Sequence, residues 1–102
     1  MIRKTIARKI ASVNIAVTDT LIPLQIKGTC KLFAHIFDGT VDQNMVDAAI
    51  VATKEMNQGI GKLWEQWLAG ECSFTEYCAK SEPFQRHYLE AVHGAFQASL
   101  RP

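Results

Sequence analysis

The residues that could do chemistry lie mostly in the last third of the chain. Glu90 and His93 form a Glu-x-x-His pair, half of the helical motif that holds two iron or manganese ions between carboxylates. The full site needs a second such pair, so two copies of this chain would have to combine. The alternative is a solvated helix face, because the pair belongs to a polar stripe of alternating charge. That stripe contains Glu82, Arg86, Glu90, His93, Gln97 and Arg101. We favour the solvated face and predict no metal and no cofactor.

Cysteine and histidine also occur with a spacing that suggests zinc. Cys72, Cys78, His87 and His93 follow the pattern C-x5-C-x8-H-x5-H. Structural zinc sites favour closer cysteine pairs, and two histidines six residues apart point to different sides of a helix. A Cys–His nucleophile pair is the catalytic alternative, but no local pattern supports it. The odd cysteine count, with no secretory signal, favours a reducing compartment, and we therefore place the protein in the cytoplasm.

Charge is divided unevenly along the chain. Residues 1–32 carry six basic and one acidic side chain, and residues 33–102 carry five basic and nine acidic ones, for a total of only +1. The basic cluster Arg3, Lys4, Arg8 and Lys9 is a candidate contact for nucleic acid or another anionic partner. An anionic membrane surface is a further alternative. The interpretation that we favour is a helix whose apolar face packs on the core and whose basic back is solvated.

Apolar periodicity predicts helices throughout. Residues 2–17 have an apolar face at four- and three-residue steps, formed by Ile2, Ile6, Ile10, Val13 and Val17. A short strand at residues 12–18 is the competing prediction, because that segment alternates and is β-branched. Thr18-Asp19-Thr20 contains N-cap residues and predicts a break in the helix. Pro23 is then expected in the first turn of a second helix. Asp38-Gly39 predicts the end of that helix, with Gly39 in the left-handed conformation.

The second half of the chain carries clearer helix signals. Thr40 with Gln43 predicts a capping box for a long helix at residues 41–69, which Gly59 and Gly61 could kink and Gly70 ends. Ser73 with Glu76 predicts a second capping box and a short helix at residues 74–79. Ser81 is then expected to cap a last helix that runs to residue 100. The predicted fold is an all-α single domain, 1–102, an irregular bundle of four to five helices around the long central one.

Aromatic residues gather after residue 63 and point to a function. Seven of the nine aromatic side chains lie there, which is many for the core of so small a domain. We predict a protein-interaction surface made of Ile60, Trp64, Trp67 and Leu68. The expected function is that of a non-enzymatic accessory or regulatory protein that binds another protein or a second copy of itself. A nucleic-acid-binding protein and a Glu-x-x-His metal protein or enzyme are the alternatives. No segment is long and apolar enough to predict a membrane span.

Overall fold

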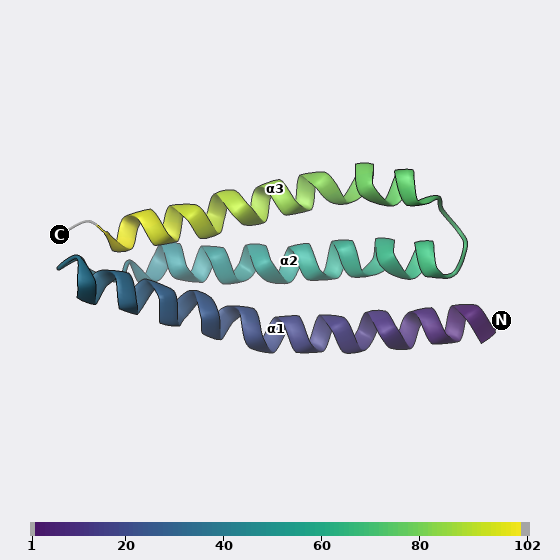
Figure 1. The fold of residues 1–102 in the computed structure, drawn as a ribbon, viewed down its shortest axis with the longest axis horizontal. Helices are drawn as coiled ribbons and strands as arrows, with labels where there is room; N and C mark the ends of the chain where they lie inside the picture. Colours follow the sequence, from purple (N-terminus) through teal and green to yellow (C-terminus); the bar gives the residue numbers. More distant parts are fainter. Residues whose placement is uncertain (1, 101–102) are drawn as a thin grey trace.

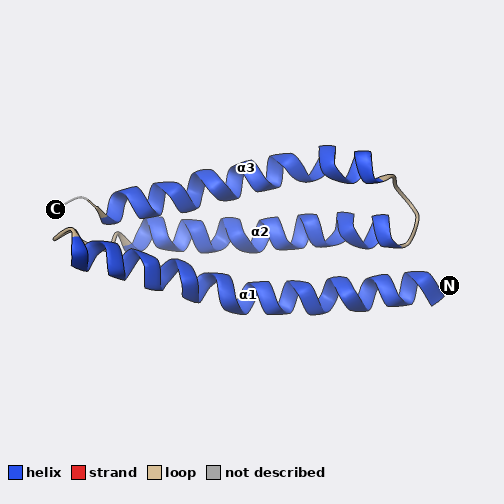
Figure 2. Cartoon of the chain, viewed as in Figure 1, coloured by secondary structure: helices blue, strands red, loops and turns tan. Residues whose placement is uncertain are grey.

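The computed structural model describes residues 2–100, and these form three helices. They are α1 (Ile2–Ile36), α2 (Gln43–Leu68) and α3 (Phe74–Ser99), and no strand occurs among residues 2–100 (Figure 2). The all-α class is confirmed. The prediction of four to five helices is wrong, because two of the expected breaks lie inside continuous helices.

The three helices run up, down and up, with α2 between the other two (Figure 1). The molecule is elongated, 54 × 23 × 18 Å. α2 packs extensively on both neighbours, whereas α1 and α3 contact each other far less. Figure 1 shows α1 and α3 lying near each other where α3 ends and diverging toward the N-terminus of α1. We call the first region the closed end and the second the open end.

The hydrophobic core occupies the closed end, where all three helices meet. Its fully or nearly fully buried members are Ile26, Cys30, Val46, Ala49, Val92 and Ala95. Cys30 donates a weak hydrogen bond to the carbonyl of Ala95, with 3.8 Å between Sγ and the oxygen. Phe33 and Phe96 meet edge to face, with their ring centroids 5.7 Å apart. Alanine and cysteine side chains let α1, α2 and α3 approach one another closely here.

The expected break at residues 18–20 does not occur, and residues 2–36 form one helix rather than two helices or a strand. Thr18 and Thr20 do not act as caps, because their hydroxyls donate to the carbonyls of Asn14 and Ala16 within α1. The carboxylate of Asp19 accepts a hydrogen bond from the Asn57 side chain of α2, at 2.8 Å. Pro23 therefore lies inside a helix, which tertiary packing holds together against the usual cost of an interior proline.

The predicted boundary at Ser81 is also wrong. Ser81 is buried, and its hydroxyl donates to the carbonyl of Cys78 one turn earlier, so α3 continues through Pro83. The capping box at Ser73 and Glu76 is confirmed. The Glu76 amide donates to Ser73 Oγ at 3.1 Å, and the Glu76 carboxylate accepts from the Ser73 amide at 3.4 Å.

The long central helix is confirmed with slightly different ends. α2 begins after Asp42, whose carboxylate accepts from the Met45 amide, so Asp42 takes the cap that the sequence suggested for Thr40. α2 is continuous through Gly59 and Gly61 and ends before Gly70, which has a φ of +80°. At the end of α1 the left-handed residue is Asp38, with a φ of +52°, rather than Gly39.

The first half of α1 is turned opposite to the expectation. Its small side chains Ala7 and Ala11 are buried against the bundle. The apolar face that was expected to enter the core is exposed instead, and it continues past the predicted break to Leu24. This outer stripe consists of Ile2, Ile6, Ile10, Val13, Val17, Leu21 and Leu24, each between 42% and 78% exposed.

Candidate functional site

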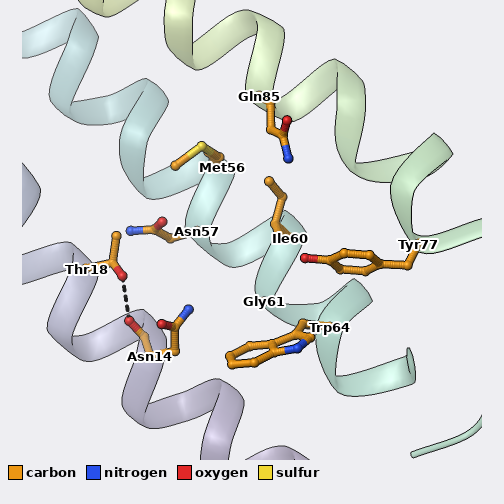
Figure 3. Close-up of a pocket in the computed structure, with 9 residues that line it drawn as sticks. All are labelled: Asn14, Thr18, Met56, Asn57, Ile60, Gly61, Trp64, Tyr77 and Gln85. Carbon is orange, nitrogen blue, oxygen red and sulfur yellow. Dashed lines mark hydrogen bonds between the residues drawn. The ribbon is translucent and has the colours of Figure 1, made fainter. Parts of the chain in front are cut away.

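An open groove lies between α1 and α3 at the open end, with α2 as its floor (Figure 3). Its volume is about 390 Å³, which lies within the range of binding pockets for small ligands or single side chains. Met56, Ile60 and Trp64 supply its apolar floor from successive turns of α2. Its lining residues are Asn14, Thr18, Met56, Asn57, Ile60, Gly61, Trp64, Tyr77 and Gln85.

Hydrogen-bonding groups rim this apolar floor. Figure 3 shows the amides of Asn14 and Gln85 on opposite sides, and the Tyr77 hydroxyl directed toward Ile60. Tyr77 is the only lining residue with a titratable side chain. Burial raises the pKa of its phenol above the usual 10.0, and the neighbouring Cys78 adds a smaller rise. A neutral, amphipathic lining of this kind is suited to binding a group that is apolar in its body and polar at its edge.

The four predicted interface residues share one end of α2 but enter three environments. Ile60 and Trp64 lie in the groove. Leu68 faces α1, where it lines a separate hollow of about 310 Å³ together with residues of the outer stripe. Trp67 packs within the chain, because its ring lies 5.1 Å from that of Phe74 and stacks on that of Tyr77 at 5.6 Å. All four side chains are partly exposed.

The basic cluster of α1 is largely engaged with α2 and the turn after it. Lys4 forms a 2.7 Å ion pair with Glu71, Arg8 pairs with Glu65 at 3.1 Å, and Arg3 donates to the carbonyl of Leu68. These side chains therefore hold the start of α1 against the acidic end of α2. All four basic side chains of the cluster remain exposed, as expected for a solvated face, but three of them turn toward α2 and the turn after it rather than away from the bundle.

The residues considered for metal or nucleophilic chemistry are not brought together. Glu90 and His93 are both exposed on α3, and among residues 2–100 no three His, Cys, Asp or Glu side chains converge on a point that could hold an ion. His87 approaches Glu55 at 3.8 Å instead. Cys30 is buried, Cys72 is partly buried and Cys78 is exposed, and all three are free thiols.

The chain was compared with protein-family models, with curated proteins and with solved structures, and none of the three comparisons found a match. Among the described residues no helix is long and apolar enough to cross a membrane.

Most groove residues could not be found from the sequence. Asn14, Thr18, Tyr77 and Gln85 are separated by up to 71 positions and meet only because α1 and α3 diverge on either side of α2. None of them belongs to a motif with a recognisable spacing. The outer stripe was visible as a periodic pattern, but a pattern alone does not tell whether an apolar face turns to the core or to a partner.

Proposed function

We propose that this protein is a non-enzymatic accessory protein that acts by binding another protein through the groove around Ile60 and Trp64. The proposal rests on one observation above all: an apolar groove floored by a partly exposed tryptophan, rimmed by neutral hydrogen-bonding side chains. Tryptophan is enriched at the energetically dominant positions of protein interfaces, where it lies in a pocket from which the partner excludes water.

The groove suits an apolar side chain of a partner protein together with its backbone. A volume of about 390 Å³ accommodates one large side chain, and the amides of Asn14 and Gln85 provide partners for the peptide groups next to it. Without such partners, the peptide groups would lose hydrogen bonds to water on binding, at a cost of roughly 1–3 kcal/mol each.

Affinity capture from the native cell tests the proposal. The full chain, Trp64→Ala and the control Leu89→Ala are compared as baits, because Leu89 is 61% exposed but lies on α3 outside the groove. We expect one set of proteins to be retained by the parent chain and by Leu89→Ala and lost with Trp64→Ala. Reconstitution with the purified partner should show binding weakened at least about thirtyfold by Trp64→Ala, as for an interface hot spot. Circular dichroism checks that each variant is folded.

The same experiment addresses the nucleic-acid alternative. Capture is repeated after nuclease treatment and with Arg3, Lys4, Arg8 and Lys9 replaced by Gln. Retention that survives Trp64→Ala but is lost with nuclease or with the glutamine variant would overturn the groove proposal in favour of nucleic acid. Proteins retained equally by all baits would also contradict it.

A further inference from the structure

The outer stripe of α1 is a continuous apolar face in a chain whose core is small. The largest fully buried side chains are Ile26 and Val46, followed by Thr53, Cys30 and Ser99. By contrast, the seven side chains of the outer stripe, five Ile or Leu and two Val, are of the same size as Ile26 and Val46 but lie exposed on one helix face. The accessible surface is 6790 Å², against about 5,800 Å² expected for a folded monomer of this mass. The molecule is elongated and exposes more surface than a compact monomer, and the outer stripe is part of that exposed surface.

The spacing of the stripe makes this face straight and long. Its members follow one another at steps of 4, 4, 3, 4, 4 and 3 residues. The steps repeat every 11 residues, close to the period of the helix, so the stripe turns only slowly around α1, in the sense that favours a right-handed supercoil. From Ile2 to Leu24 the stripe is about 33 Å long at 1.5 Å per residue. With each side chain about half exposed, it offers roughly 700 Å² of apolar surface, close to the ~800 Å² that each partner buries in a standard interface.

From these features we infer that the outer stripe is a homodimer interface, in which α1 packs antiparallel on α1 of a second copy about a two-fold axis at Val13. The inference goes beyond the proposed function and does not depend on it, because it names a second copy of this chain as a partner. It assigns a surface separate from the groove around Trp64.

The relief of the stripe favours this antiparallel register. One shallow hollow lies beside Ile2, Ile6 and Ile10, and a shallower depression lies beside Ala16, Val17, Thr20 and Leu21. A two-fold axis at Val13 brings position i of one copy to the level of position 26 − i of the other. Leu21 and Leu24 of one copy then reach the first hollow of the second copy. By the same symmetry, Ile6 and Ile10 of one copy reach the shallower depression of the other copy. The two ends of the outer stripe therefore complement each other.

Charge favours the same arrangement over a parallel one. Around the helix, Lys9 and Lys27 border the stripe, and Lys31 extends this margin beyond Leu24. In a parallel pair each lysine would face its own equivalent. In the antiparallel pair the two Lys9 residues are eight helical positions apart, about 12 Å, which exceeds the ~10 Å screening length at 0.1 M salt. The stripe consists of the Ile, Val and Leu residues that form helix seams, and it lacks the Trp and Phe residues that accompany Leu on membrane-surface helices.

Sedimentation of the full chain tests the inference, with Val13→Glu as the disrupting variant and Val51→Glu as its control. Both valines are similarly exposed, at 57% and 54%, but Val51 lies on α2. We expect a dimer for the parent chain and for Val51→Glu. Val13→Glu should raise the dimer dissociation constant by roughly a hundredfold or more, because two carboxylates would meet at the axis. A parent chain that sediments as a monomer at 100 times the concentration used in the reconstitution with the purified partner would overturn the inference.

Two further measurements keep the test decisive. Mixing Val13→Glu with Val13→Lys should restore a dimer. A dimer in the mixture would also support the interface if either variant alone unfolds. No recovery would contradict the axis at Val13. In a background with Cys72 and Cys78 replaced by Ser, Ile6→Cys should cross-link with Thr20→Cys and not with itself. Self-linkage of Ile6→Cys would overturn the antiparallel register.

Other outcomes separate this inference from its competitors and from the proposed function. A monomer that binds vesicles of anionic phospholipid, and loses that binding with Val13→Glu, would replace the second copy by a lipid surface. A monomer that still captures a protein in a Trp64-dependent manner would overturn the inference and leave the proposed function standing. A Val13-dependent dimer that captures no protein in a Trp64-dependent manner would overturn the proposed function and leave the inference standing.

Discussion

The closed and open ends of the bundle are built from the same three helices but differ in the size of the side chains between them. At the closed end Cys30, Ala49 and Ala95 are almost completely buried, and all three helices meet around them. At the open end α2 presents Met56, Ile60 and Trp64, and α1 and α3 diverge around these larger side chains. The two ends thus differ in the side chains that lie between the helices, which are buried at the closed end and partly exposed in the groove at the open end.

The largest expected difference between the two ends is the cost of removing an equivalent side chain. Ile26→Ala at the closed end should lower the free energy of unfolding by about 2–5 kcal/mol, because Ile26 is only 2% exposed and its loss leaves a cavity. Ile60→Ala should cost about 1 kcal/mol or less, because water already reaches its side chain in the groove. Urea denaturation followed by circular dichroism measures both. Equal losses would mean that the open end is packed as tightly as the closed one.

Glycine-to-alanine substitutions compare the two ends through smaller changes in the free energy of unfolding. Gly28 has no atom within 4 Å of where a Cβ would be, so Gly28→Ala should stabilise α1 by about 0.5–1 kcal/mol. Gly61 lies under Ile15, whose Cδ1 would be 2.5 Å from a new Cβ. Ile15 would have to move, so Gly61→Ala should gain less than Gly28→Ala or lose stability. Thermal melts of the two variants give the comparison, and a larger gain at Gly61 would show that Ile15 is loosely held.

The smallest expected effect is the pH dependence of the open end. Burial disfavours the phenolate of Tyr77 and raises its pKa above 10.0 in the folded state. The folded protein therefore holds this proton more tightly than the unfolded chain does. The corresponding stability is fully present below pH 10 and is lost as the pH rises through the folded pKa. Tyr77→Phe should reduce the fall in unfolding free energy above pH 10, and Tyr88→Phe serves as the control. An unchanged slope would mean that Tyr77 titrates like a solvated phenol.

The parts of the fold that were predictable from the sequence are those determined by neighbouring residues. The capping box at Ser73 and Glu76, the helix end before Gly70 and the long helix that precedes it each depend on local geometry, and each occurs. The breaks at Thr18 and Ser81 were wrong, because their hydroxyls bond to carbonyls of the preceding turn. Local chemistry allowed both outcomes, and packing against α2 selected one.

The candidate site was less predictable than the fold. Ile60 and Trp64 were identified because an exposed tryptophan among aliphatic residues suggests an interface, and this remains a proposal. The α1 and α3 sides of the groove carry no sequence signal, since they depend on how far two helices diverge. The orientation of α1 was missed for a related reason. Its two faces are both apolar. The face with the small residues Ala7 and Ala11 turns inward, and Lys4 and Arg8 pair with Glu71 and Glu65 beside it.

Pro23 divides α1 into two halves that we expect to differ in the rate of amide hydrogen exchange. Proline has no amide hydrogen, so the carbonyl of Asp19 receives no bond from Pro23 and the ladder of α1 is interrupted between its two halves. Residues after Pro23 reach Ile26 and Cys30 in the core, whereas residues before it face the open end. The first half of α1 can therefore fray by breaking few buried contacts, while the second half opens only with the whole bundle. In a monomer, the stretch that carries most of the outer stripe is thus held less tightly than the second half of α1.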